Sequence, residues 1–318
     1  MREINLTNSD IAYLSNARPV RPLIYWELGN FCSYKCSYCS PMFSSGSVPY
    51  QDTQVVQNTL KRFGGTFVIF SGGEPTLHPD FEKIIKEKPQ GILIGVVSNA
   101  SRPIAFWERA APYLYFTILT YHPENAKLDK FLEIANLVYK VKKVIGRVNV
   151  VMLPERWDEC VNVYNTFVNA GINVVAKQLL IGFGEGCKGS GLDYTPEQID
   201  WIANSAFPTG VGSPSINVYN DKHEVIHFTS ATELFAMKQT NFMGWKCYVP
   251  GQYLVISSVG NTFTTSCDQK EKVGNIFGEF TFPNEPIICQ QKLCWAYSDV
   301  AGLKSSPNYN GPVPKSTV

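Results

Sequence analysis

Residues 24–39 read IYWELGNFCSYKCSYC, an apolar run that leads into three closely spaced cysteines. The run is β-rich, so we expect Cys32, Cys36 and Cys39 to follow the first strand of a sheet. Iron–sulfur clusters are normally held by four thiolates, so a set of three leaves one iron with an open coordination position. Open positions on metals are where substrates bind and react. The segment therefore predicts a strand with a reactive metal centre at its end.

Further β-rich runs follow, each short and apolar, with helical patterns between them. Together with the first run, the predicted strands cover residues 22–28, 66–70, 92–97, 115–119, 147–153 and 174–180. The clearest helical segments cover residues 80–88, 128–142 and 155–170. Six β–α repeats imply a parallel sheet with right-handed crossovers, hence an α/β fold built as an open or partial barrel. Active sites of such sheets lie at the carboxyl ends of the strands.

Two of the next strands also end in residues suited to ligand binding. The second runs into Gly72-Gly73-Glu74-Pro75, where paired glycines let the backbone approach a ligand and the carboxylate can accept from an ammonium group. The third ends in Ser98-Asn99, small polar groups suited to a ribose hydroxyl. Because these strand ends meet at one edge of the sheet, a single ligand can touch both of them and the cysteine loop.

The overall composition is that of an ordinary globular protein. The chain has 318 residues and a net charge of +1, from 28 basic and 27 acidic side chains. Without a basic stripe, nothing points to a nucleic-acid backbone or an anionic membrane as the partner. The start lacks the apolar region of a signal peptide, and no stretch approaches about 18 apolar residues, so we expect a cytoplasmic protein without a membrane span. Its nine cysteines are then metal ligands or reactive thiols rather than disulfides.

The C-x3-C-x2-C spacing followed by Gly-Gly-Glu-Pro resembles the radical S-adenosylmethionine (SAM) superfamily over roughly residues 20–187. The resemblance implies a [4Fe–4S] cluster held by Cys32, Cys36 and Cys39, whose open iron chelates the amino and carboxylate groups of SAM. Reduction of the cluster then cleaves SAM to a 5′-deoxyadenosyl radical, which abstracts a hydrogen atom from the substrate. A flavodoxin- or ferredoxin-type reductant is implied as well. A zinc site or unrelated thiols are the alternatives, which the Gly-Gly-Glu-Pro run disfavours.

The resemblance also implies a set of SAM contacts. They are Tyr38, Gly72, Gly73, Glu74, Ser98, Asn99, Thr120 and Asn149. Tyr38 is expected against the adenine, residues 72–74 at the methionine amino group, and Ser98 and Asn99 at the ribose. Thr120 stands where the family often has serine, so this contact is a mild departure from the family pattern.

A second group of cysteines lies in the C-terminal third, at Cys247, Cys267, Cys289 and Cys294. The first two flank a predicted hairpin with strands at 253–257 and 262–265. This layout resembles the twitch form of the SPASM/twitch extension, which implies an auxiliary [4Fe–4S] cluster with complete protein coordination. A structural zinc site on the same thiolates is the alternative.

The resemblance and a breaker-rich run at residues 207–214 predict four parts of the chain. These are an N-terminal segment at 1–20, a radical SAM partial barrel at 21–206, a small twitch-like domain at 207–304 and a flexible tail at 305–318.

Three further residues are candidates for the chemistry itself. Cys187 lies in a glycine-rich loop after the sixth strand, where it is either a hydrogen-atom donor to a substrate radical or an incidental cysteine. His122, after the fourth strand, is either a base or substrate contact or an ordinary loop histidine. Lys177 interrupts an apolar strand, and a buried lysine needs a partner or a ligand. Cys160, by contrast, lies on an apolar helix face and is predicted to be core.

These features together predict a radical SAM oxidoreductase- or isomerase-type enzyme that acts on a small polar metabolite, with an auxiliary cluster assisting oxidation or rearrangement. Radical modification of a ribosomal peptide or of a hypermodified nucleobase is the alternative. A non-enzymatic iron–sulfur or zinc protein for binding or electron transfer is the rival class, and it leaves the Gly-Gly-Glu-Pro run unexplained.

Overall fold

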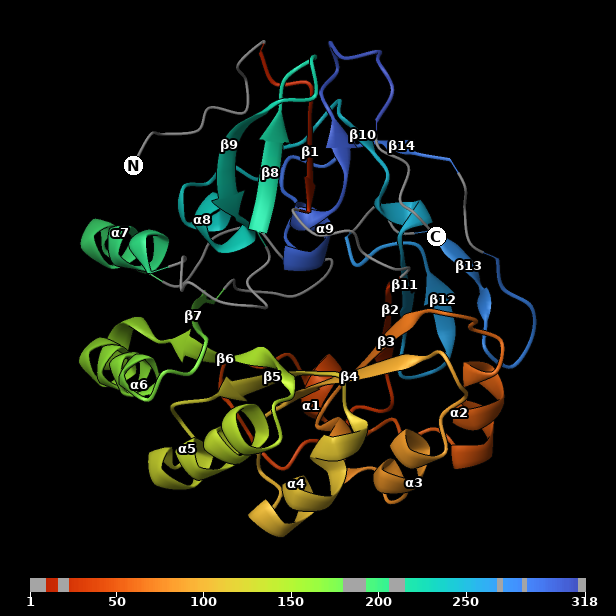
Figure 1. Cartoon of the computed structure of the whole chain (residues 1–318), viewed down its shortest axis with the longest axis vertical. Coiled ribbons are helices and arrows are strands. Elements are labelled where there is room, and N and C mark those ends of the chain that lie inside the picture. The colour runs from red at the N-terminus through yellow and green to blue at the C-terminus, as the bar shows by residue number, and fades with distance from the viewer. Residues whose placement is uncertain are drawn as a thin grey trace.

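A computed structural model of the chain describes residues 10–16, 23–179, 193–205, 215–267, 271–281 and 285–313. Within these residues, two β-sheets organise the molecule, one of nine strands and one of six. Figure 1 shows the larger sheet with helices packed along one of its faces, and the smaller sheet on its opposite side.

Six strands of the larger sheet run parallel and pair in chain order. They are β2 (Leu23–Glu27), β3 (Phe67–Ser71), β4 (Leu93–Ser98), β5 (Phe116–Tyr121), β6 (Ile145–Met152) and β7 (Val174–Gln178). Each predicted strand is confirmed, with its described ends within two residues of the prediction. The sheet does not close, because β7 lies at one edge and β13 (Lys272–Asn275) at the other. The fold is thus α/β with an open, largely parallel sheet.

Helices cover the convex face of this sheet (Figure 1). They are α2 (Thr53–Leu60), α3 (Phe81–Lys86), α4 (Ile104–Ala110), α5 (Leu128–Asn136) and α6 (Trp157–Asn169). A π-helical turn, Leu137–Val141, continues α5, so the helix predicted over 128–142 is two pieces. Cys160 is fully buried on α6, as its place on the apolar face predicts.

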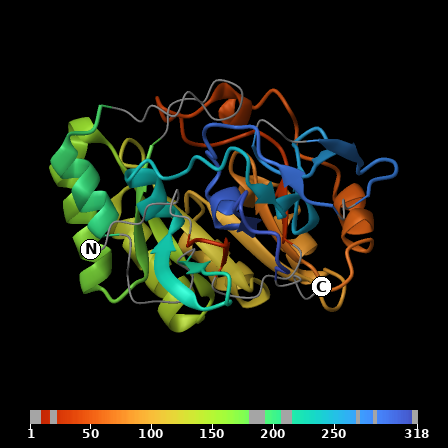
Figure 2. The ribbon, with the colours of Figure 1, turned by 90° about the horizontal axis from the view of Figure 1, so that it is seen from above.

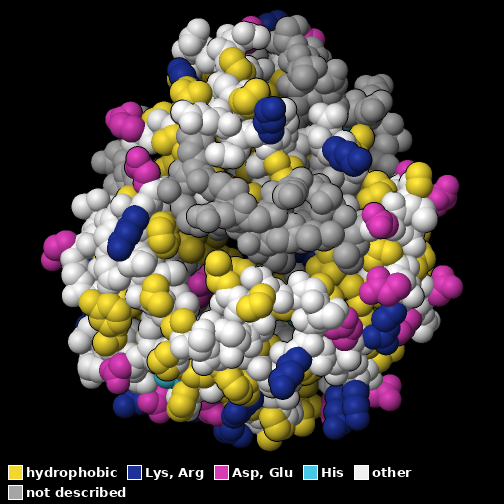
Figure 3. Space-filling model, turned by 180° about the vertical axis from the view of Figure 1, so that it is seen from behind, with side chains coloured by type: hydrophobic (Ala, Val, Ile, Leu, Met, Phe, Trp, Pro, Cys, Tyr) yellow, Lys and Arg dark blue, Asp and Glu magenta, His cyan; other side chains and the backbone are white. Residues whose placement is uncertain are grey.

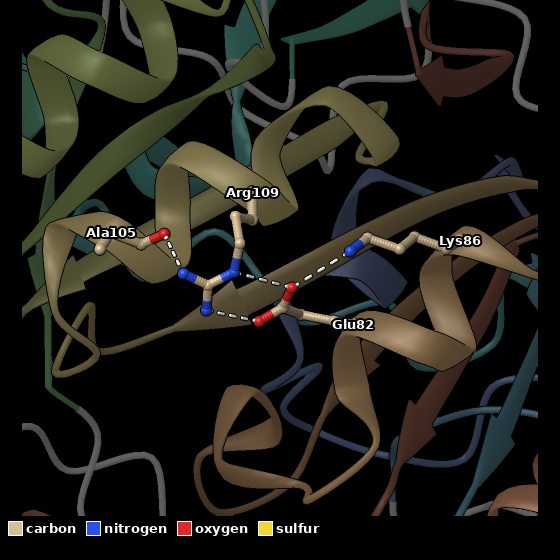
Figure 4. Close-up of polar contacts among 4 residues, drawn as sticks. All are labelled: Glu82, Lys86, Ala105 and Arg109. Carbon is tan, nitrogen blue, oxygen red and sulfur yellow. Dashed lines mark hydrogen bonds and ion pairs between the residues drawn. The ribbon is translucent and has the colours of Figure 1, made fainter.

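An ion-pair network links α3 to α4 on the outer surface (Figure 4). Arg109 donates to both carboxylate oxygens of Glu82, at 3.1 and 2.8 Å, and to the Ala105 carbonyl at 2.8 Å. Lys86 reaches the same carboxylate at 3.2 Å. Exposed pairs of this kind add little stability, so the apolar contacts beneath them hold the helices to the sheet.

The two faces of the parallel strands differ in burial. On β2, Ile24 and Trp26 point to the helices and are fully buried, whereas Tyr25 and Glu27 on the opposite, concave face are only partly buried. This alternation arises because successive side chains of a strand point to opposite faces. The concave face is therefore where a ligand can reach the sheet.

The predicted hairpin near residue 260 extends the barrel sheet. Strand β11 (Tyr253–Ile256) pairs in parallel with β2, and β12 (Asn261–Phe263) and β13 follow in antiparallel order. Gln51 fixes the junction, because its side-chain amide donates to the Ser257 and Ser258 carbonyls at 3.1 and 2.9 Å. The predicted hairpin is confirmed. Its parallel pairing with β2 was not predicted from the sequence.

The smaller sheet is antiparallel and joins both ends of the described chain. Its order is β14 (Ile287–Ile288), β10 (Lys246–Cys247), β15 (Lys304–Ser305), β1 (Tyr13–Asn16), β8 (Ser215–Tyr219) and β9 (Val225–Ser230). The tail expected to be flexible from residue 305 instead begins in β15, where Ser305 pairs with Tyr13, and the Tyr309 ring packs 5.8 Å from the Tyr13 ring. This pairing and aromatic contact hold the described part of the tail in place.

Three further helices lie in the C-terminal part of the chain, namely α7 (Pro196–Asn204), α8 (Ala231–Ala236) and α9 (Tyr297–Ala301). The short helix α1 (Pro41–Ser44) follows β2. Seen from above in Figure 2, α9 and the smaller sheet lie over the parallel strands. A contact between Lys177 on β7 and Tyr297 on α9 confirms that α9 faces the concave side of the barrel sheet.

Surface charge is mixed. On the face shown in Figure 3, basic and acidic side chains are interspersed among the described residues. Among the helices that the structure describes, none is both long and apolar enough to cross a membrane.

Candidate functional site

The three cysteines after β2 lie on one loop, partly buried and close enough to influence one another. Burial, together with the nearby Glu74, Cys36 and Cys39, raises the pKa of the Cys32 thiol to about 11. Burial also raises the pKa of Cys36. A cation bound by these sulfurs would offset the effect of burial on Cys32 and Cys36 and favour their thiolate forms.

Amide groups point at two of these sulfurs. The Asn99 side chain donates to the Cys32 sulfur at 3.5 Å, and the Asn125 side chain donates to the Cys36 sulfur at 3.3 Å. The Tyr34 backbone N–H adds a contact to Cys32 at 3.4 Å. Such donors stabilise negative sulfur and tune the metal that it binds. Asn99 was expected at a ribose, whereas Asn125 had no role in the sequence-based prediction.

The paired glycines hold the cysteine loop against the end of β3. Gly73 donates its backbone N–H to the Gly29 carbonyl at 3.1 Å, and the next N–H, of Glu74, donates to the Phe31 carbonyl at 2.7 Å. A Cβ on Gly73 would lie 2.1 Å from the Phe31 oxygen, and one on Gly72 would lie 2.2 Å from the Gly29 oxygen. Gly72 also has φ +113°, which favours glycine. The close approach that the glycines permit is thus to the cysteine loop.

The Glu74 side chain points into the protein and is fully buried. Its carboxylate accepts from the Thr76 N–H at 3.0 Å, the Ser98 hydroxyl at 2.8 Å and the Asn99 N–H at 2.6 Å. Burial raises the pKa of Glu74, while these donors lower it. The carboxylate therefore organises the ends of β3 and β4, and Ser98 and Asn99, predicted as SAM contacts, are brought together by it.

His122, after β5, contacts the cysteine loop. Its Nδ1 lies 2.9 Å from the Tyr38 hydroxyl, and the two rings stack with centroids 6.0 Å apart. Glu124 accepts the Ser37 N–H at 2.7 Å. Burial lowers the pKa of His122 to about 4, against the opposing influence of Glu124. This histidine, bonded to Tyr38, helps to hold the cysteine loop in place.

Polar residues also line the concave face beside this loop. Thr120 and Asn149 are direct neighbours in the β5–β6 register, and Asn149 accepts from Arg147 at 3.0 Å. Lys177 lies on β7, with its ammonium 2.6 Å from the centroid of the Tyr297 ring. Cys187 lies outside the residues that the structure describes.

Comparison with known proteins identifies the family. A model of the radical SAM superfamily matches residues 26–185, half of the chain. The chain belongs to the radical SAM superfamily. The matched region spans the last two residues of β2, the cysteine loop and β3 to β7, so the family covers the site described above.

Solved structures show the same fold. Native anSMEcpe with bound AdoMet and the Cp18Cys peptide aligns with a TM-score of 0.55 at 16% identity, over 81% of this chain and 78% of that chain. SuiB of Streptococcus suis bound to the precursor peptide SuiA also aligns with a TM-score of 0.55, at 14% identity, over 83% and 64% of the two chains. At these identities the likeness concerns the fold alone.

A curated relative shares a shorter segment. A probable GTP 3′,8-cyclase of Methanocella arvoryzae is 30% identical over 78 residues, which is 24% of this chain and 25% of the relative. The chain therefore matches about a quarter of that relative's length.

Radical SAM proteins carry a [4Fe–4S] cluster and SAM, and the donor set after β2 fits such a cluster. Three thiols lie on one loop at the carboxyl ends of the strands, and two of them receive amide N–H groups. Soft thiolate ligands select iron–sulfur clusters.

The four downstream cysteines of this radical SAM chain line one cavity. Cys247, Cys267, Cys289 and Cys294 surround it, together with Asp299 and Lys304. Burial raises the pKa of Cys247 and of Cys294, and the nearby Lys304 lowers both. In the described parts of the chain, no three His, Cys, Asp or Glu side chains are arranged to hold a single metal ion. The four cysteines, far apart in sequence, are thus brought to one cavity.

Sequence reasoning missed Glu124, Asn125, Arg147 and Tyr297. Glu124 and Asn125 carried a weak signal, because they follow His122 and Pro123 shortly after a predicted strand. Arg147 also carried a signal in the sequence, because it is a charged residue within a predicted apolar strand. Tyr297 gave no signal, because only the tertiary structure brings α9 to β7.

Proposed function

We propose that this chain binds a [4Fe–4S] cluster through Cys32, Cys36 and Cys39, cleaves SAM reductively, and abstracts a hydrogen atom from a substrate on the concave face of the barrel sheet. The observation that carries the proposal is the loop geometry. Backbone hydrogen bonds at residues 72–74 fix the cysteine loop at the carboxyl edge of the parallel strands. When bound, the cluster supplies the electron that cleaves SAM and an open iron for its amino and carboxylate groups.

The strand ends around the loop supply the groups that would hold SAM. Backbone atoms of residues 72–74 are better placed for the methionine amino group than the Glu74 carboxylate, because the carboxylate already accepts from protein donors. Ser98 and Asn99 stand beside Cys32, and Thr120 and Asn149 stand together on β5 and β6. Tyr38, fixed by His122, is the aromatic group for the adenine.

The cavity lined by the second cysteine group supports an auxiliary [4Fe–4S] cluster in a twitch-like region. Its four thiolates give the cluster complete protein coordination, which suits electron transfer. The net reaction is then an oxidation or rearrangement, with electrons exchanged through a flavodoxin- or ferredoxin-type partner in the reducing cytoplasm. A structural zinc ion on the same thiolates is the competing assignment.

The substrate is a small polar molecule or a peptide. The concave face offers partly buried tyrosine, arginine and lysine side chains to either. The solved structures of anSMEcpe and SuiB with the same fold contain bound peptides. Peptides are therefore to be tested as substrates beside small polar molecules.

Iron analysis after anaerobic reconstitution tests the two metal assignments. The proposal predicts about eight irons per chain, four for each cluster. Alanine at Cys32, Cys36 and Cys39 should leave about four irons, and alanine at the downstream cysteines should leave the other four. Cys160→Ala is the matched control, because this cysteine is buried in the core and should leave the iron content unchanged. Zinc in place of iron at both groups would contradict the proposal.

A further inference from the structure

Two cationic side chains lie on the concave face, on neighbouring strands. Arg147 and Val151 share one face of β6 because side chains alternate along a strand, and Val151 is paired with Lys177 of β7. Arg147 is close enough to Lys177 for its charge to lower the pKa of the lysine, on top of a larger effect of burial. Two like charges on one sheet face repel each other unless an anion lies near them.

Lys177 has an aromatic neighbour and no anionic one. Its ammonium lies over the Tyr297 ring, and within the described residues no acceptor or carboxylate contacts it. Lys177 is partly buried, an ammonium carries three donors, and even partial burial of a charge without a partner costs free energy. Glu27, an acidic residue on the same face, lies five strands away on β2 and accepts the Ser258 N–H at 3.1 Å.

A fully buried lysine among the described residues, Lys304, shows how a structural lysine is accommodated. Lys304 is 1% exposed and donates to three backbone carbonyls, those of Asp299, Val300 and Gly302. Asp299 also stands beside it. Lys177 differs in having neither carbonyls nor a carboxylate among the described residues, so a structural role does not account for it.

The Tyr297 hydroxyl is an independent sign of a ligand at the same place. It is buried and has no hydrogen-bond partner among the described residues, although its ring packs against Phe235 with centroids 4.4 Å apart. Buried hydroxyls in proteins are nearly always hydrogen-bonded, so an orphan donor beside Lys177 can be completed by a water, an ion or a ligand. This hydroxyl belongs to the ring that Lys177 contacts.

We propose that Lys177 and the Tyr297 hydroxyl, with Arg147 adding positive charge, form an anion-binding subsite, and that the substrate carries a carboxylate or phosphate group that binds there. An oxyanion supplies acceptors for the ammonium and the hydroxyl at once and offsets the paired positive charges. The assignment of the anion to the substrate rests on the proposed function. The binding of an anion at the subsite is independent of it.

The test measures anion binding to anaerobically reconstituted protein saturated with SAM, by isothermal titration calorimetry. Inorganic phosphate and succinate are the probes, and they separate a phosphate-bearing ligand from a carboxylate-bearing one. Lys177→Gln should weaken binding of the preferred probe roughly tenfold or more, the effect expected when one charged hydrogen bond is lost. Lys130→Gln is the matched control, because Lys130 is exposed on α5, and it should bind the probe as the wild type does.

Tyr297→Phe gives a second, conservative variant. Because the hydroxyl has no described protein partner, its removal should leave the thermal midpoint unchanged or higher, yet weaken probe binding several-fold. A lower midpoint with unchanged probe binding would instead assign the hydroxyl to the protein interior and overturn its place in the subsite.

Three results would overturn the subsite: binding of neither probe, equal binding by wild type and Lys177→Gln, or competition between the probe and SAM, which would assign the cations to the SAM carboxylate. Formation of 5′-deoxyadenosine by the wild-type protein is measured separately. Lysine-dependent anion binding without SAM cleavage supports the subsite and counts against the proposed function.

Discussion

The Glu74 carboxylate accepts the backbone N–H of Asn99 at 2.6 Å, so the end of β3 fixes the end of β4. The Asn99 side chain then donates to the Cys32 sulfur at 3.5 Å. The buried carboxylate thus reaches the metal-binding loop through one intermediate residue. The motif around Glu74 therefore acts as a scaffold for the cysteine loop.

Replacing the buried acid tests this scaffold. In Glu74→Gln, the amide brings N–H donors against the donors from Thr76, Ser98 and Asn99, so we expect the free energy of unfolding to fall by about 2–4 kcal/mol. Urea unfolding of the apoprotein measures the change. Glu82→Gln, on the exposed surface of α3, is the control and should have a much smaller effect. Equal stability of the two variants would remove Glu74 from the scaffold.

A single methyl group at Gly73 should displace the cysteine loop. Its Cβ would lie 2.1 Å from the Phe31 carbonyl oxygen, so Gly73→Ala is expected to cost about 3 kcal/mol of stability and the iron of the first cluster. Iron analysis should show loss at the first site alone.

Gly64→Ala is the matched control for that variant, because a Cβ there meets no atom within 4 Å. It should retain wild-type stability and iron content. Full iron in Gly73→Ala would show that the loop is held by other contacts.

The amide donors at the sulfurs should tune the first cluster. Asn125→Ala removes the contact to the Cys36 sulfur, and outer-sphere changes of this kind typically reduce activity roughly 10- to 100-fold. Loss of a donor to sulfur should also lower the reduction potential of the cluster, measured by a redox titration followed by electron paramagnetic resonance. Asn58→Ala, on the exposed side of α2, should change neither quantity. An unaltered potential in Asn125→Ala would show that the contact is incidental.

His122 should make the apoprotein less stable in acid. Burial lowers its pKa from 6.5 to about 4, so the unfolded chain binds the proton more readily than the folded chain does. Its contribution is therefore present above pH 6.5 and is lost as the pH falls towards 4, by at most about 3 kcal/mol. Urea unfolding at pH 7 and pH 4.5 measures this loss.

The His122→Asn variant should show a smaller loss of stability between those two pH values. His223→Asn, which replaces an exposed histidine in a left-handed conformation that asparagine tolerates, should behave as the wild type does. An identical pH dependence in His122→Asn would show that this histidine is not the titrating group.

The parallel strands could be predicted from sequence because each is a short apolar run bounded by breakers. Local pattern also gave the hairpin at Tyr253–Ile256 and Asn261–Phe263. The attachment of β11 to β2, and of Ser305 to Tyr13, could not be read locally, because such pairings join residues far apart in sequence.

The site followed the same division. Cysteine spacing divided the candidate ligands into two sets. The role of a side chain also depends on the direction in which it points, and the sequence does not show this direction. The Glu74 carboxylate accepts the Asn99 N–H inside the protein, and Asn125 reaches Cys36 from a neighbouring loop. Lys177 was suspected because it interrupts an apolar strand, whereas Tyr297 became visible only through its contact with that lysine.

Formation of 5′-deoxyadenosine from SAM tests the central claim most directly. The anaerobically reconstituted protein, supplied with dithionite, should release this nucleoside, and Cys36→Ala should release none while keeping the iron of the downstream site. SAM left intact by a fully iron-loaded wild-type protein, or equal cleavage by Cys36→Ala, would contradict the account.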